Sequence, residues 1–225
     1  MKLSLHSPVD LIKGVGKKYK DALNNGGILS VFDLLLHFPV HYLDFSRVST
    51  VVGSEKEIYL LEVEKWSVSR VYRRRLTVLK LNARIGDQPV SVVFFNKAYL
   101  AEFFKEHRTA YIYGQFQFKD NRFECNTPMI FPIFPGTRPP VVPVYNRIGT
   151  LKSGHLKKII DAALDVLDDD PDTLPAYCCQ KYDFPSFTEA FQGIHRPGQY
   201  RPNDIYGLKK RFIYSEFLYF QMELQ

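Results

Sequence analysis

The amino-acid sequence predicts an α+β protein in which a five-stranded β-barrel is flanked by helical segments. Short runs of alternating apolar and polar residues lie between residues 58 and 126, and apolar residues recur at helical spacing before and after them. Positive charge is concentrated in the same middle part: residues 56–125 hold 13 Lys and Arg against 8 Asp and Glu, whereas residues 126–225 hold 11 of each. The sequence therefore indicates a basic barrel between two helical flanks.

The composition indicates a folded, soluble protein of a reducing compartment. Apolar residues make up 45% of the 225 residues, which is too many for a disordered chain. The N-terminus lacks the apolar core of a signal peptide and no later apolar run could span a bilayer, so we expect a cytoplasmic protein without membrane contact. The cysteines Cys125, Cys178 and Cys179 have no zinc-site spacing and fit a reducing compartment.

The motifs of an enzyme are missing from this sequence. It has no G-x-x-x-x-G-K-[ST] phosphate loop, and no predicted strand ends in an acidic pair suited to Mg²⁺. His37 and His41 have the spacing of helical metal ligands, but Pro39 between them interrupts a helix. We therefore expect no cofactor, no bound metal and no ATP hydrolysis from this chain alone, and a binding module is favoured over an enzyme.

Changes in pattern predict three domains, at residues 1–55, 56–145 and 146–225. In the first, apolar residues recur at helical spacing, with a break at Gly14 and Gly16. Glycines before a helix let backbone N–H groups approach a phosphate, and Lys17 follows directly, so this segment resembles a helix-hairpin-helix that contacts DNA. The alternative is a glycine turn that serves only helix packing.

The middle domain has the element order of an OB-fold, the five-stranded barrel whose strand face and loops bind oligonucleotides. Alternation and turn residues predict three strands, a helix and two further strands. In chain order these elements cover residues 58–68, 76–85, 89–95, 97–105 (the helix), 109–119 and 121–126.

After the barrel, the sequence predicts a strap and then helices. Residues 130–144 are rich in proline and should be extended, because proline lacks the N–H group that helices and strand ladders need. Helices are expected over residues 154–167, 185–193 and 208–225. The last helix has more apolar surface than a solvated helix needs, which indicates that it docks on another domain. Its apolar residues are Leu208, Phe212, Ile213, Phe217, Leu218 and Phe220.

A run of arginines falls in the connection between the first two predicted strands, a loop that OB-folds use for nucleic acid. Guanidinium groups suit this role because their planar donors grip phosphate in a bidentate way and also stack on bases. The alternative is an exposed hairpin that only keeps the protein soluble. The residues of this run are Arg70, Arg73, Arg74 and Arg75.

Aromatic residues follow at the end of the third predicted strand. Phe94 and Phe95 are adjacent, so one should face the core and the other should face solvent. An outward ring beside a basic loop, with Lys97 and Tyr99 close by in sequence, predicts a stacking platform for bases. In the alternative, a bulge at the strand end places both phenylalanines in the core.

Several segments carry a resemblance to a known family, and they cover residues 12–19, 27–28, 31–39, 42–44, 93–100, 143–145, 151, 155–160, 190–197 and 210–218. In this order along the chain, they resemble the N-terminal region of the RecG family, bacterial ATP-dependent DNA helicases that remodel branched DNA. The resemblance implies an OB-fold wedge that splits strands at a replication fork or Holliday junction, with two aromatic residues that stack at the branch point and correspond to Phe95 and Tyr99.

The same resemblance implies partners and cofactors outside this chain. A full-length member of the family would use ATP and Mg²⁺ in motor domains, act in the nucleoid on forks, Holliday junctions and single-stranded arms, and meet a single-stranded DNA-binding protein. Two other functions stay open: a self-contained OB-fold protein that binds single-stranded DNA or RNA, and an OB domain whose arginines bind an acidic protein.

Overall fold

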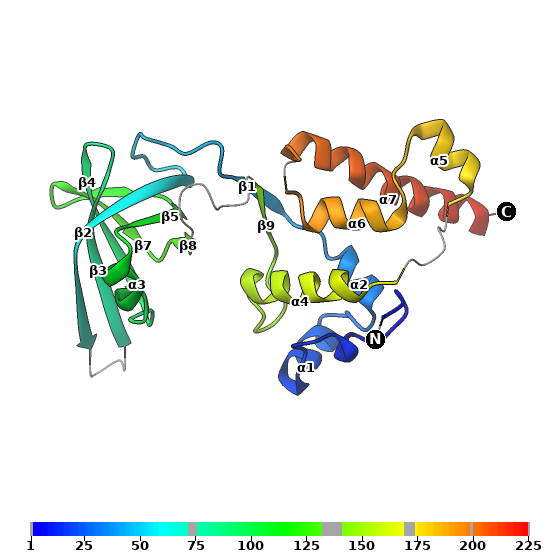
Figure 1. The fold of residues 1–225 in the computed structure, drawn as a ribbon, viewed down its shortest axis with the longest axis horizontal. Helices are drawn as coiled ribbons and strands as arrows, with labels where there is room; N and C mark the ends of the chain where they lie inside the picture. Colours follow the sequence, from blue (N-terminus) through cyan, green and yellow to red (C-terminus); the bar gives the residue numbers. More distant parts are fainter. Residues whose placement is uncertain (1, 72–75, 132–140, 169–173, 199, 225) are drawn as a thin grey trace. The chain divides into compact units, whose positions relative to one another are not determined.

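The computed structural model describes residues 2–71, 76–131, 141–168, 174–198 and 200–224. The chain divides into two units: unit 1 contains Met1–Asp44 and Pro139–Gln225, and unit 2 contains Phe45–Arg138. Both flanks of the chain therefore belong to one helical unit, whereas the large sheet is formed by the middle of the chain (Figure 1). The domain boundaries predicted near residues 55 and 145 stay a prediction.

Unit 1 consists of helices and a two-stranded sheet. Ser30 and Ser186 each begin a helix, because their hydroxyl oxygens accept hydrogen bonds from the backbone N–H groups of Asp33 and Glu189, both at 3.2 Å. The described elements are η1 (Val9–Leu11), α1 (Lys17–Asn25), α2 (Val31–Leu36), β1 (His41–Asp44), β9 (Val141–Val144), α4 (Ser153–Val166), α5 (Ala176–Tyr182), α6 (Phe187–His195) and α7 (Pro202–Glu223).

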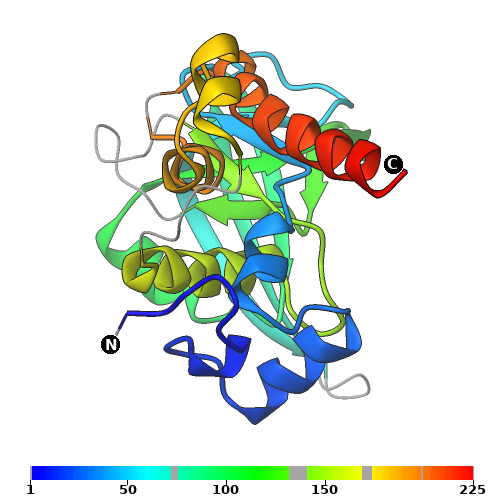
Figure 2. The same ribbon diagram turned by 90° about the vertical axis from the view of Figure 1, so that its right-hand side faces the viewer.

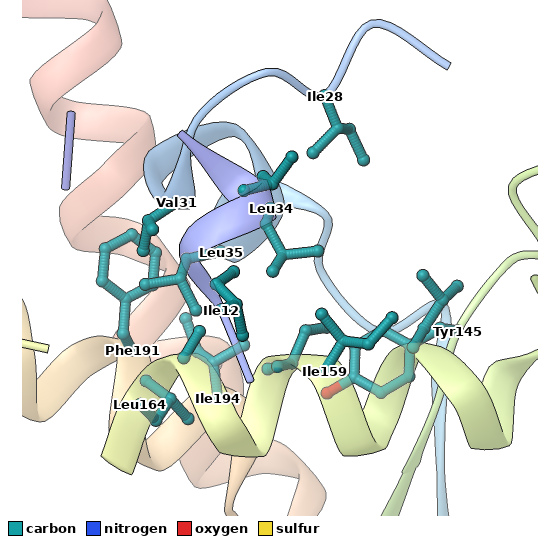
Figure 3. Packing of buried hydrophobic residues seen from close by; sticks show 14 of the residues in the cluster. Ile12, Ile28, Val31, Leu34, Leu35, Tyr145, Ile159, Leu164, Phe191 and Ile194 are labelled. Carbon is teal, nitrogen blue, oxygen red and sulfur yellow. The ribbon is translucent and has the colours of Figure 1, made fainter. Parts of the chain in front are cut away.

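The core of unit 1 brings together segments that are far apart in sequence. Leu34 of α2, Ile159 of α4 and Ile194 of α6 are all buried in one cluster (Figure 3). Helix α7 lies beside α6 in both views, and its Phe212 ring is 4.7 Å from that of Phe191 between centroids (Figure 2). Burial of these side chains from both flanks holds unit 1 together.

Strands β1 and β9 form the two-stranded sheet of unit 1. They pair antiparallel, with His41 opposite Val144 and Tyr42 opposite Pro143. Proline is tolerated there because a two-stranded sheet has only edge strands. The strap predicted over residues 130–144 is extended where it is described, at its two ends, and its middle lies outside the described residues.

In its described residues, unit 2 is a sheet with one helix. The strand order is β6-β7-β4-β3-β2-β5-β8, and neighbours are antiparallel except for β4 and β7. Gly86 has a φ of 55° in the predicted turn between β3 and β4. The described elements are β2 (Glu57–Val71), β3 (Leu76–Ile85), β4 (Gln88–Phe95), α3 (Leu100–Glu106), β5 (Thr109–Gly114), β6 (Gln117–Lys119), β7 (Arg122–Asn126) and β8 (Met129–Phe131).

The predicted three strands followed by a helix are present, but four short strands follow the helix where two were predicted, and the described residues form no closed barrel. The strand expected over residues 109–119 is broken after Gly114. The Phe116 ring turns into the core there, and the backbone N–H of Phe116 donates a hydrogen bond to the Gly53 carbonyl at 2.9 Å. As a result β5 pairs with β2 while β6 pairs with β7. The described sheet has seven strands and two edges.

The C-terminal helices differ from their predicted bounds in two ways. Helix α7 begins at Pro202, earlier than the predicted residue 208, because proline fits the first turn of a helix. Helix α5 was not predicted at all. Of the predicted apolar face, Phe212 is buried in unit 1, whereas Ile213, Phe217 and Phe220 are exposed. None of the helices in the described ranges combines the length and the apolar character needed to cross a membrane.

Candidate nucleic-acid interface

The two phenylalanines at the end of β4 point to opposite faces of the sheet, as strand alternation requires. Phe94 lies opposite Leu79 of β3 and is fully buried in the core of unit 2. Phe95 is 40% exposed. Phe94, a candidate contact on sequence grounds, is thus a core residue without a ring face open to a base, and Phe95 is the outward aromatic residue.

The turn after Phe95 is fixed by a residue that the sequence analysis did not single out. Asn96 has a φ of 55°, a left-handed conformation that asparagine adopts more readily than most residues. Its backbone N–H donates to the Thr77 carbonyl at 2.7 Å, and its side-chain oxygen accepts from the Thr77 N–H at 3.1 Å. These two hydrogen bonds hold the end of β4 against the start of β3 and so orient Phe95.

Tyr99 lies at the start of α3, four residues after Phe95. The helix is anchored because Leu100 and Phe104 are buried in the core of unit 2. Tyr99 itself is 67% exposed. Lys97, between the two exposed rings, places its ammonium 5.2 Å from the centroid of the Phe94 ring. One short segment between β4 and α3 therefore carries two exposed rings and a cation.

The long β2–β3 ribbon brings the base of the arginine loop next to this segment. Arg70 pairs with Thr77, the residue that binds Asn96, and Phe95 pairs with the adjacent Val78. Two spacings between neighbouring strands therefore separate the backbones of Arg70 and Asn96, which corresponds to about 10 Å across the sheet. Their register directs the side chains of Arg70 and Phe95 to opposite faces of the sheet. The other loop arginines, Arg73, Arg74 and Arg75, lie outside the described residues.

A further cation, missed by the sequence analysis, shares the face of Phe95. Lys80 of β3 pairs with Val93, two residues before Phe95, and its side chain is exposed. Within the described ranges Lys80 takes part in no ion pair, unlike Arg84, which lies 3.7 Å from the Asp87 carboxylate. Only the register of β3 against β4 could have revealed that Lys80 and Phe95 face the same way.

The glycine turn belongs to unit 1. Gly14 has a φ of 94°, and Gly16 is the N-cap of α1, of which Lys17 is the first residue. The element before the turn is only the three-residue η1, so the first helix of the predicted helix-hairpin-helix is reduced to one 3₁₀ turn. Asp10 forms an ion pair with Lys20, which offsets part of the positive charge of α1.

Comparison with known proteins identifies relatives over nearly the whole chain. The chain is 28% identical to the ATP-dependent DNA helicase RecG of Streptococcus pneumoniae over 99% of its length, and 27% identical to that of Borreliella burgdorferi over 93%. It is 24% identical to the Bacillus subtilis protein over its full length. The chain spans about a third of the length of these relatives, since it covers 33%, 32% and 33% of them.

The fold and a family model agree with this likeness. A solved structure of RecG bound to a three-way DNA junction matches 87% of the chain with a TM-score of 0.71 and 20% identity, and the match covers 28% of that chain. The model of the RecG wedge domain matches residues 8–167. The protein therefore belongs to the RecG wedge-domain family.

Proposed function

We propose that this chain is the part of a branched-DNA helicase that binds the branch point of a replication fork or Holliday junction and separates the strands there. Membership of the RecG wedge family supports this function. The observation that carries it is the turn between β4 and α3, which Asn96 and Thr77 fix and which presents Phe95 and Tyr99 to solvent. A rigid pair of exposed rings is suited to a base that has lost its stacking partner.

The sheet of unit 2 supports an OB-type arrangement. Strand β2 pairs with both β3 and β5. After only Gln115 and Phe116, the chain continues from β5 into β6, which belongs to the opposite end of the strand order. A chain that passes in two residues from the second-last strand at one end of its sheet to the strand at the other end is consistent with a partly open barrel.

The two kinds of contact have different roles in this function. Arginines of the β2–β3 loop and Lys80 attract phosphates of any DNA, because that attraction does not depend on base pairing. The rings of Phe95 and Tyr99 need an exposed base face. Inside a linear duplex both faces of each base are covered by neighbours, whereas a fork exposes the first unpaired base on each arm. The phosphate contacts therefore give affinity, and the rings give preference for a branch.

The whole helicase would supply what this chain lacks. Motor domains would bind ATP and Mg²⁺ and move the duplex, and the exposed Ile213, Phe217 and Phe220 of α7 are suited to dock on them. We expect this assembly to act in the bacterial cytoplasm at the nucleoid and to meet a single-stranded DNA-binding protein. Forks, Holliday junctions and single-stranded arms are its expected substrates.

Replacing Phe95 with alanine should weaken binding to a fork by about 1–3 kcal/mol and change binding to linear duplex little, because only the fork offers a base face to the ring. Tyr99→Ala should act in the same direction. Fluorescence anisotropy with labelled fork and duplex of equal length measures both affinities. Equal losses on fork and duplex would contradict the proposed function.

The arginine loop supplies a matched control. If about four phosphates are engaged, log K should fall with log salt at a slope of roughly −3.6, and Arg73→Ala combined with Arg74→Ala should flatten that slope by about two contacts. This change should weaken fork and duplex alike. A fork-specific loss from the arginine changes would assign branch recognition to the loop and not to the rings.

A further inference from the structure

The β6–β7 hairpin of unit 2 presents an aromatic residue that the proposed branch contact does not use. Phe118 of β6 is 65% exposed, which is unusual for so large an apolar side chain. Its ring packs edge-on against Phe123 of β7, with 5.1 Å between centroids. Phe123 packs in turn against the core of unit 2. Phe118 is therefore held in place from one side while its other face is open to solvent.

Two cations lie at the tip of the same hairpin, on the face opposite to Phe118, because neighbouring strand residues alternate between faces. Lys119 and Arg122 are directly opposite each other in the hairpin, where like charges repel. The turn between them consists of Asp120 and Asn121, with φ values of 49° and 61°, which suits a tight two-residue hairpin. Within the described part of the chain neither Lys119 nor Arg122 forms an ion pair with a carboxylate. The tip of the hairpin thus carries two cations and one carboxylate, Asp120, directly after the strand residue that holds the open ring.

The position of Phe118 separates it from the branch contact. Phe118 pairs with Phe123, which pairs with Val90 of β4, and Phe95 lies five residues further along the same strand. Five strand residues correspond to about 16 Å. By register the side chain of Phe118 extends from the face of Val90, opposite to that of Phe95. One base therefore cannot stack on both rings.

We propose that Phe118, with Lys119 and Arg122, is a second stacking site that holds a single-stranded DNA arm as it leaves the branch point; this inference rests on the proposed function. Single-stranded DNA is the favoured partner because the hairpin combines an open aromatic face with two cations at its tip that form no ion pair within the described residues, and rings with nearby cations bind unpaired strands without sequence preference. Paired arms offer phosphates to the cations but hide their bases from the ring.

The test compares two branched DNAs that differ only in one arm. Phe118→Ala should weaken binding to a fork with one single-stranded arm about 5- to 150-fold, and leave binding to a three-way junction with fully paired arms unchanged. Phe95→Ala should weaken both. Lys119→Ala with Arg122→Ala should flatten the salt slope on a single-stranded oligonucleotide by about 1.4, the value for two phosphate contacts.

Two further variants keep the test independent of folding. Phe118→Trp retains a stacking ring and should preserve affinity for the single-stranded arm, whereas Gln117→Ala, on the adjacent and oppositely directed residue, should have no effect. Equal loss on both DNAs, or none on the single-stranded arm, would overturn the second site. If Phe118→Ala behaves as expected but Phe95→Ala weakens neither DNA, the arm site stands and the branch contact at Phe95 fails.

Discussion

Replacing Phe94 with alanine is expected to lower the free energy of unfolding of unit 2 by about 3–5 kcal/mol, the range for truncating a fully buried phenylalanine. The ring lies inside the sheet, opposite Leu79, in the cluster that also contains Phe104 of α3. Its removal leaves a cavity that strands fixed by their hydrogen bonds cannot close. The loss should therefore be structural and should weaken binding to fork and duplex alike.

The neighbouring residue provides the control. Phe95→Ala should cost about 1 kcal/mol or less in stability, because its ring is largely at the surface. Denaturant unfolding followed by tryptophan fluorescence reports on unit 2, since Trp66 is the only tryptophan in the sequence and packs beside Phe104, with 6.5 Å between ring centroids. Similar losses for Phe94→Ala and Phe95→Ala would contradict the assignment of one ring to the core and the other to solvent.

A second large effect is expected from His195, which is buried in unit 1 between the rings of Tyr145 and Phe191. The Leu35 carbonyl can only accept a hydrogen bond, so Nε2–H donates to it at 2.7 Å and Nδ1 accepts from the Tyr145 hydroxyl at 3.0 Å. The imidazole is thus neutral with both nitrogens satisfied. Through these bonds α6 is joined to α2 and to the segment that follows β9.

Acid should weaken this link. Burial lowers the pKa of His195 from its ordinary 6.5 to about 4, so the unfolded chain takes up a proton more readily than the folded chain. The stability that the neutral His195 gives the folded protein is complete above pH 6.5 and is lost as the pH falls from 6.5 to 4. The pKa difference between the folded and unfolded chain corresponds to about 3 kcal/mol in the free energy of unfolding. Lys157, Asp161 and His37 are the charged and titratable groups whose fields also act on this ring.

His195→Gln tests this pH dependence. Glutamine can replace both hydrogen bonds but does not titrate, so the stability of unit 1 should show a flatter profile between pH 6.5 and 4. Far-ultraviolet circular dichroism follows the unfolding of this helical unit. His6→Gln, at an exposed histidine, should leave the profile unchanged. An unaltered acid slope in the His195 variant would assign the transition to other groups.

Local pattern was sufficient to predict most of the elements that carry the site. Alternation along β4 predicted that only one of Phe94 and Phe95 faces solvent, and apolar spacing predicted the helix that follows. Alternation alone did not decide which of the two rings faces solvent, because that depends on how β4 is aligned with β3 in the sheet. The pairing of Thr77 with Asn96 across 19 residues likewise depends on that register.

Features set by long-range packing were beyond the sequence pattern. The break at Phe116, the parallel pairing of β4 with β7 and the exposure of Phe118 all depend on how the second half of the sheet folds back on the first. The union of both flanks in unit 1 depends on the core shared by α2, α4 and α6. Apolar residues such as Ile159 and Ile194 predict that their helices bury one face, but not what covers it.

The most direct test of the central claim, that Phe95 stacks on a base at the branch point, places a fluorescent purine analogue at that base. Binding of the unaltered protein should quench the analogue, because an aromatic ring then covers its face. At saturating protein, Phe95→Ala should bind the fork without this quenching, whereas Phe118→Ala should quench normally. Undiminished quenching by the Phe95→Ala protein at full occupancy would contradict the account.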